Sequence, residues 1–148
     1  MIKILISSCL LGNNCKWNGR NNARELIMSI KDKVEFIPVC SEVLGGLPTP
    51  RIPSEIVGNR VINEINLDVT DHFLEGAEKV LRIAKENNVK YAIFKERSPS
   101  CGVHQVYNGK FERTATEGKG ITTRLLEKNG IRVYSDEEIE ILIKHQKD

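Results

Sequence analysis

Residues 91–102, YAIFKERSPSCG, join an apolar segment to a polar turn that contains a cysteine. The run at residues 91–94 is typical of a short buried strand. The segment after it holds three serine or glycine positions, a proline and Cys101, as in a turn or loop. A free cysteine behaves as a small hydrophobic residue and favours the core. We therefore predict a strand that delivers a functional loop.

The same pattern occurs twice more in the chain. Residues 2–8 form an apolar run that stops at Cys9, and residues 34–39 form another that stops at Cys40. In open parallel α/β sheets, ligands bind beyond the carboxyl ends of the strands. If the three strands are parallel neighbours, the three cysteines converge on one point. This placement predicts a metal or cluster site at that edge of the sheet.

The remaining segments alternate between helix and strand patterns. We predict helices over residues 22–31, 70–88 and about 120–129, a terminal helix after residue 135, and a further strand over 131–134. Hairpins are expected at 55–65 and 103–111, with turns at Gly58–Asn59 and Asn108–Gly109. The resulting fold class is α/β, a single-domain three-layer sandwich over residues 1–148, with a mainly parallel, Rossmann-like central sheet plus small β-hairpins.

Side-chain patterns add detail to three of these helices. The helix over 70–88 is expected to begin at a Thr70 cap, and its spacing predicts a buried face. That face comprises Phe73, Leu74, Ala77, Val80, Leu81 and Ala84. Gly130 is expected to end the helix predicted over about 120–129. The terminal helix is predicted to start with a capping box at Ser135 and Glu138 and to bury Ile139, Leu142 and Ile143.

Composition excludes several classes of protein. The 148 residues are 40% hydrophobic and 28% charged, with a formal net charge of +2. Such a chain resembles an ordinary globular domain and carries no dedicated nucleic-acid surface. The apolar start at residues 2–6 is too short for a signal peptide, and no run reaches transmembrane length. We expect a cytoplasmic protein with no membrane partner, and the oligomeric state is open between a monomer and a homodimer.

The four cysteines, at positions 9, 15, 40 and 101, leave three interpretations open. A reducing cytosol disfavours disulfides, and the absence of a C-x-x-C pair disfavours a structural zinc ribbon. The cysteines are then buried thiols, one catalytic thiol with bystanders, or ligands of an iron–sulfur cluster. Their placement at strand ends favours cluster ligands. It also favours Cys9 over Cys15, although residue chemistry alone does not choose between these two.

Neighbouring residues supply further candidates. Glu42, two residues after a thiol, is an acid/base candidate or else a surface carboxylate. Arg51, at the end of a stiff loop with two glycines and two prolines, is either an anion- or carbonyl-binding group or solvated. Trp17 is a packing residue or, as the minority interpretation, a stacking platform. His72, His104 and His145 show no ligand spacing. The chain has no Walker loop, G-x-G-x-x-G or G-x-S-x-G motif.

Three linked motifs resemble one family over essentially the whole chain, the thiouracil desulfidases, long labelled a domain of unknown function. They are residues 8–12 with Cys15, residues 38–40 with Glu42 and 45–51, and residues 95–102. Two departures are visible. Ser41 stands where a proline is common, and Lys16-Trp17-Asn18 replaces a more usual Arg-Tyr-Asp. Both lie beside the matched cysteines and affect the choice of substrate more than the cluster.

The resemblance implies a [4Fe–4S] cluster held by Cys9, Cys40 and Cys101, with Cys15 as an accessory thiol. It further implies that an open iron binds the sulfur of a small thiolated pyrimidine, 2- or 4-thiouracil, which is converted to uracil and sulfide without net redox change. The implied catalytic residues are Glu42 and Ser98. The implied substrate-binding residues are Ser100, Ser8 and Arg51.

Three alternatives stay open. The first is an iron–sulfur or zinc binding module without turnover, which has no need of Glu42 and Ser98. The second is a desulfidase for a thiolated nucleoside or nucleotide, with Lys95, Arg97 and Arg51 available for a phosphate. The third is a plain α/β domain with reduced thiols.

Overall fold

A computed structural model describes residues 1–139. Its centre is a four-stranded, all-parallel sheet with the strand order β2-β1-β5-β8. The strands are β1 (Lys3–Ser7), β2 (Glu35–Val39), β5 (Tyr91–Phe94) and β8 (Arg132–Ser135). The α/β fold class and the parallel central sheet are thus confirmed, and the three strands that precede Cys9, Cys40 and Cys101 are neighbours.

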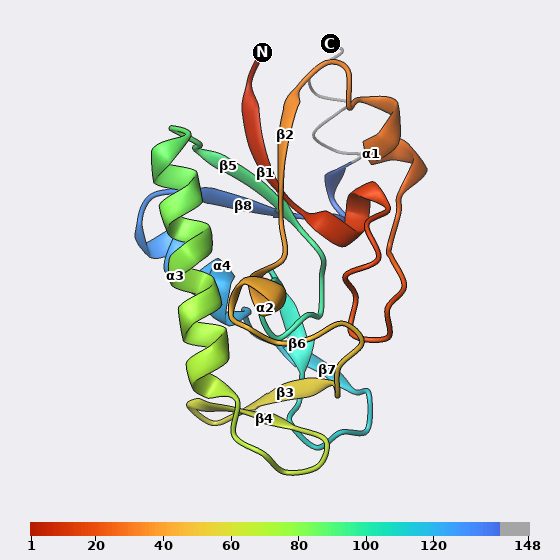
Figure 1. The fold of residues 1–148 in the computed structure, drawn as a ribbon, viewed down its shortest axis with the longest axis vertical. Helices are drawn as coiled ribbons and strands as arrows, with labels where there is room; N and C mark the ends of the chain where they lie inside the picture. Colours follow the sequence, from red (N-terminus) through yellow and green to blue (C-terminus); the bar gives the residue numbers. More distant parts are fainter. Residues whose placement is uncertain (140–148) are drawn as a thin grey trace.

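Helices cover both faces of the sheet, as predicted for three layers (Figure 1). Because side chains alternate along a strand, Leu5 and Ile6 of β1 point to opposite faces. Leu5 belongs to the core beneath α3 (Thr70–Glu86) and α4 (Ile121–Lys128), whereas Ile6 belongs to a second core with Ile27 of α1 (Glu25–Ser29). Within residues 1–139, no helix has both the length and the apolar character needed to cross a membrane.

The strand order places a crevice at the carboxyl edge of the sheet. From β1 the chain first goes to β2 on one side and later to β5 on the other, so the direction of winding reverses at β1. Such a switch point leaves room for a ligand beyond the strand ends. Two hairpins, β3–β4 (Ser54–Val57 and Arg60–Asn63) and β6–β7 (Gln105–Tyr107 and Ala115–Glu117), extend past this edge (Figure 1).

Directly after β1, Ser8–Leu11 form a 3₁₀ helix, η1. Two predictions of local structure were wrong. The segment after Cys40 begins with a short helix, α2 (Ser41–Leu44), where an irregular loop was expected. The first hairpin turns at Gly58 as predicted, but the second does not turn at Asn108–Gly109. Its strands are joined by the wide connection 108–114, because the carboxylate of Glu55 accepts hydrogen bonds from the backbone N–H groups of Gly109 (3.0 Å) and Phe111 (3.2 Å).

Helix ends also differ from the sequence pattern. α1 is shorter than the predicted 22–31, and Leu74 is 48% exposed on α3, so its predicted burial was wrong. Thr70 does not cap α3, since its hydroxyl accepts a hydrogen bond from the N–H of Val61 instead. The predicted capping box is only half formed. Glu138 Oε1 accepts a hydrogen bond from the N–H of Ser135 at 2.7 Å, but Ser135 ends β8 and its hydroxyl accepts from the N–H of Glu137, while the N–H of Glu138 donates to the Ser135 carbonyl oxygen. Ile139 is buried as predicted; the predictions for Leu142, Ile143 and His145 lie outside the described residues.

Two glycines let α2 pack directly on α3. A Cβ atom at Gly45 would lie 2.0 Å from the carbonyl oxygen of His72, and one at Gly76 would lie 2.0 Å from that of Ser41. Neither distance is physically allowed, so the two backbones approach more closely than any side chain permits. The contact fixes the position of α2, and with it the direction of the residues that follow Cys40.

This contact predicts that Gly76→Ala destabilises the protein by about 1–3 kcal/mol, the usual cost of overpacking. An alanine would otherwise favour the helix, so the expected sign is opposite to that of intrinsic helix propensity. The free energy of unfolding in urea measures the effect. Glu78→Ala, at an exposed position of the same helix, is the matched control and should change stability by less than about 0.5 kcal/mol. A G76A protein as stable as the wild type would contradict the prediction.

Candidate active site

A cavity of about 510 Å³ opens at the carboxyl edge of the sheet. All nine residues singled out from the sequence line it: Ser8, Cys9, Cys15, Cys40, Glu42, Arg51, Ser98, Ser100 and Cys101. They come from segments that lie far apart in the chain. A wider hollow of about 720 Å³ lies near Met1 and Phe36 and has no cysteine in its lining. The cavity at the strand ends is therefore the candidate site.

The ends of the central strands position three of the thiols. Cys9 lies in η1, directly after β1, and Cys40 is the residue between β2 and α2. Cys101 follows β5 by way of the loop that carries Ser98 and Ser100. β1 and β5 are tied together here, because the backbone N–H of Lys95 donates to the buried hydroxyl of Ser7 at 3.0 Å. The expected convergence of thiols is present.

The fourth thiol, Cys15, lies between two of the others. Its hydrogen bonds lower the pKa of Cys9 to about 7 and that of Cys40 to about 6, and they raise its own pKa strongly. Burial opposes both lowered values, while the amide of Asn22, 3.4 Å from Cys9 Sγ, supports the lower pKa of Cys9. Cys15 therefore favours the thiolate form of both neighbours, which is the form that binds iron.

Cys101 has a different environment. It is the most buried of the four cysteines, and burial raises its pKa to about 12. The hydroxyls of Ser7 and Ser100 act in the opposite direction, with Ser100 Oγ 3.7 Å from the sulfur. A buried thiol of this kind becomes a thiolate when a metal or cluster replaces its proton.

Glu42 and Arg51 form an ion pair at the side of the cavity. Arg51 Nε donates to Glu42 Oε1 at 3.0 Å, and the two side chains are only 6% and 15% exposed. The same guanidinium also donates to the carbonyl oxygens of Cys15 (3.0 Å) and Pro48 (3.3 Å). The structure thus commits Arg51 to protein partners, which hold the Glu42 carboxylate in one orientation.

Two serines connect the loop after β5 to this carboxylate. Ser98 Oγ accepts hydrogen bonds from the backbone N–H groups of Ser100 (3.2 Å) and Cys101 (3.0 Å), and it lies 2.9 Å from Ser100 Oγ. Ser100 Oγ donates to Glu42 Oε2 at 2.8 Å. A hydroxyl has only one proton, and Ser100 donates its proton to Glu42. In the contact between the two serines, Ser98 is therefore the donor and Ser100 the acceptor. The hydrogen bonds therefore run in one direction, from Ser98 through Ser100 to Glu42.

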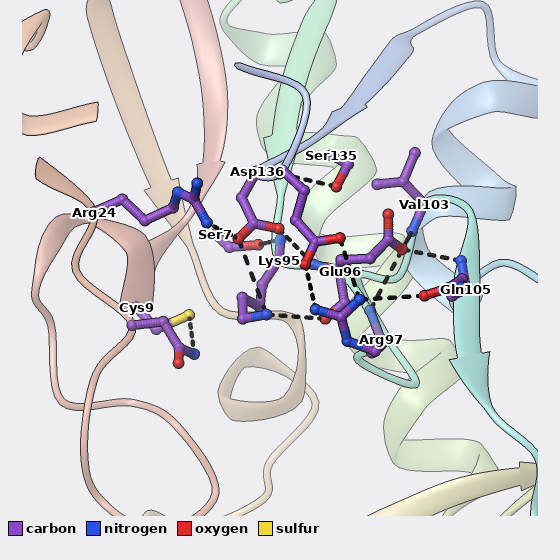
Figure 2. A network of polar contacts seen from close by, with 12 residues as sticks. Ser7, Cys9, Arg24, Lys95, Glu96, Arg97, Val103, Gln105, Ser135 and Asp136 are labelled. Carbon is purple, nitrogen blue, oxygen red and sulfur yellow. Dashed lines mark hydrogen bonds and ion pairs between the residues drawn. The ribbon is translucent and has the colours of Figure 1, made fainter. Parts of the chain in front are cut away.

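The buried carboxylate of Glu96, which was not predicted from the sequence, fixes the loop that carries Ser98, Ser100 and Cys101. Glu96 Oε1 accepts hydrogen bonds from the N–H groups of Val103 (2.7 Å) and Gln105 (3.0 Å) (Figure 2). It also accepts one from the N–H of His104 (2.9 Å). Burial opposes the charge of Glu96, but the three N–H groups outweigh it and hold its pKa below the usual value. An acidic residue two positions after a buried strand was the only sequence signal for this role.

The first turn of α4 forms backbone hydrogen bonds with the same loop. Its N–H groups at Ile121 and Thr122 donate to the carbonyl oxygens of Pro99 and Ser100, both at 2.9 Å. A Cβ atom at the preceding residue, Gly120, would lie 2.4 Å from the Ser100 carbonyl. The positions of the loop serines are thus set by two elements that the sequence did not connect with the site.

The donor set has the chemistry that a [4Fe–4S] cluster needs. Such clusters are held by cysteine thiolates, and Cys9, Cys40 and Cys101, which follow three neighbouring parallel strands, line one cavity. Among residues 1–139, no group of three or more His, Cys, Asp or Glu side chains is arranged to hold one metal ion.

Comparisons with known proteins agree with this chemistry. Residues 4–138 match the model of a family described as 2-thiouracil desulfurase. The uncharacterized protein YbbK of Bacillus subtilis (strain 168) is 40% identical over 150 residues, which cover 95% of this chain and 99% of YbbK. A solved structure of the [4Fe-4S]-dependent thiouracil desulfidase TudS matches with a TM-score of 0.91 and 38% identity, over 99% of both chains.

Proposed function

Because the chain belongs to the 2-thiouracil desulfurase family, we propose that it is a [4Fe–4S]-dependent desulfidase that removes sulfur from thiolated pyrimidines. Thiouracil and water give uracil and hydrogen sulfide, so no electron is gained or lost. The proposal is supported by the close structural similarity to TudS and by the four thiols gathered around one cavity. Residues 1–148 are proposed to act as one domain.

Cys9, Cys40 and Cys101 are the proposed ligands of the cluster. They follow three adjacent parallel strands, Cys9 in η1 after β1, Cys40 directly after β2 and Cys101 at the end of the loop after β5. Cys15 is the proposed accessory thiol, because it lines the cavity beside Cys9 and Cys40 but lies further along the loop that follows η1. With three protein thiolates, the cluster supplies an open iron, a soft Lewis acid for the sulfur of the substrate.

Glu42 is the proposed acid/base residue. Its carboxylate is oriented by Arg51 and Ser100, and it takes a proton from the water that attacks the carbon of the thiocarbonyl group. Ser98 is the second proposed catalytic residue, because its hydroxyl is hydrogen-bonded to Glu42 through Ser100. Ser100 is proposed to bind the polar edge of the pyrimidine. Ser8, whose hydroxyl accepts a hydrogen bond from Asn13, is proposed to bind substrate from the opposite side.

The observation that carries the proposal is the contact of Ser100 with Glu42 beside the thiols, since a simple cluster carrier needs no oriented base. The test is the iron and acid-labile sulfide content of protein purified without oxygen, followed by turnover of 2- and 4-thiouracil. We expect about four irons per chain and release of uracil and sulfide. Absence of iron after anaerobic reconstitution would overturn the proposal, and a stable cluster without turnover would favour the binding module.

A thiolated nucleoside or nucleotide is the second candidate substrate. The cavity extends beyond the thiols to Tyr107, Phe111 and Arg113 of the β6–β7 hairpin and to Trp17 on the loop after Cys15. These aromatic and cationic groups suit a ribose or phosphate attached to the base. Comparison of kcat/KM for 4-thiouracil, 4-thiouridine and its monophosphate separates the two candidates, because a higher value for the monophosphate requires contacts in this outer part.

A further inference from the structure

Asp136, Arg24 and Lys95 form a group of charged side chains that has no role in the proposed reaction. Asp136, which is buried, follows β8, the strand beside β5. Its Oδ1 accepts a hydrogen bond from the N–H of Glu96 at 2.8 Å, and its Oδ2 lies 3.2 Å from Arg24 Nη1 and 4.0 Å from Lys95 Nζ (Figure 2). One carboxylate is therefore shared by two cations, and this group as a whole carries excess positive charge.

Lys95 is the member of this group that reaches the cavity. Its ammonium group donates to the carbonyl oxygen of Glu96 at 3.2 Å, and its side chain is 26% exposed. Its backbone N–H is bound to Ser7, two residues before Cys9, and both Lys95 and Cys9 line the cavity. Figure 2 shows the lysine side chain between Cys9 and Arg97.

The other charged groups around Lys95 have partners of their own. Arg97 pairs with Glu137, and the carboxylate of Glu96 is directed at the backbone of Val103 and its neighbours. Asp136 is closer to Arg24 than to Lys95. Lys95 is thus held in place by weak partners, and its charge is only partly neutralised by Asp136.

A centre of this kind needs positive charge nearby. A [4Fe–4S] core with three thiolates carries a net negative charge, and the sulfide produced by the reaction adds more. Charges in a partly dehydrated cavity interact more strongly than charges in water. We propose that Lys95 is a fixed positive charge that stabilises the thiolate centre and the sulfide released from the substrate, with Asp136 as its positioning residue. This inference rests on the proposed function.

The test uses the cluster-loaded protein and two measurements other than turnover. The first is the midpoint potential of the cluster from an EPR-monitored redox titration, since net charge sets the potential of iron–sulfur centres. The second is the affinity for sodium sulfide, followed by visible absorption. Lys95→Met is expected to lower the potential and to weaken sulfide binding roughly tenfold, the effect of one removed charge at low effective dielectric. Lys95→Arg should retain most of both.

Lys110→Met is the matched control. It removes the same charge from an exposed lysine that does not line the cavity, where solvent screens the interaction, so both measurements should match the wild type. If K95M equals the wild type in potential and sulfide affinity, the inference is overturned. If K95M and Lys95→Gln lose iron while K95R keeps it, the need for positive charge is supported. A wild-type protein without a cluster would instead overturn the proposed function, so the two failures are distinguishable.

Discussion

Replacing Glu42 with glutamine is expected to lower kcat for thiouracil by roughly 10²- to 10⁴-fold, the usual contribution of a general acid/base. Glutamine fills the same volume and still accepts a hydrogen bond from Ser100, but it cannot take a proton from water. Because the ligand thiols are untouched, iron and acid-labile sulfide should stay at the wild-type level. The rates are measured without oxygen and normalised to iron content.

Glu64→Gln provides the control, since Glu64 is a second carboxylate in the cavity lining but is exposed. Its kcat should stay close to that of the wild type. Thermal unfolding of E42Q is followed in parallel, because the nearly buried Arg51 loses its charged partner. Wild-type turnover in E42Q would exclude Glu42 as the base, and loss of iron would assign it a role in holding the cluster instead.

Alanine at Cys40 or Cys101 is expected to remove the cluster and all desulfidation, from about four irons per chain to almost none. Each of these residues follows a different strand of the sheet, Cys40 directly after β2 and Cys101 at the end of the loop after β5. A thiolate removed from such a site leaves one iron without a protein ligand on that side. Iron and sulfide analysis after anaerobic reconstitution measures the loss directly, and circular dichroism reports whether the sheet has formed.

Alanine variants of Cys9 and Cys15 test which of these two cysteines is the third ligand. Cys9→Ala is expected to lose iron like the other two variants, whereas Cys15→Ala should keep the cluster. The physical reason is that Cys9 lies in η1, which directly follows β1, whereas Cys15 lies further along the loop. Retention of iron in C9A together with its loss in C15A would replace Cys9 by Cys15 in the ligand set.

The parallel sheet and the convergence of the cysteines were predictable because both depend on local patterns. An apolar run reports a strand, and parallel strands place their carboxyl ends on one edge. The helix after Cys40 was missed because its four residues are too few to show helical periodicity. Leu74 followed the helical pattern, but it is 48% exposed at the edge of a buried face that includes the adjacent Phe73.

Long-range partners were beyond local patterns. Nothing near Gly76 indicates that a carbonyl oxygen of Ser41, far away in the chain, leaves no space for a side chain there. Likewise, Glu96 reads as an ordinary surface carboxylate until the backbone of residues 103–105 folds over it. Motif resemblance located Glu42 and Ser98, but only the folded chain shows that Ser100 connects them.

The contact between α4 and the loop of Cys101 has a consequence for biosynthesis. The hydroxyl of Thr123 donates to the carbonyl oxygen of Cys101, and the N–H of Thr122 donates to that of Ser100. Domains fold as units during synthesis, and here the last thiol is not in place until residues near position 123 have left the ribosome. Most of the 148-residue chain must therefore be translated before a cluster is inserted. Iron–sulfur assembly factors would meet a nearly complete protein, and nascent chains truncated before α4 would remain without iron.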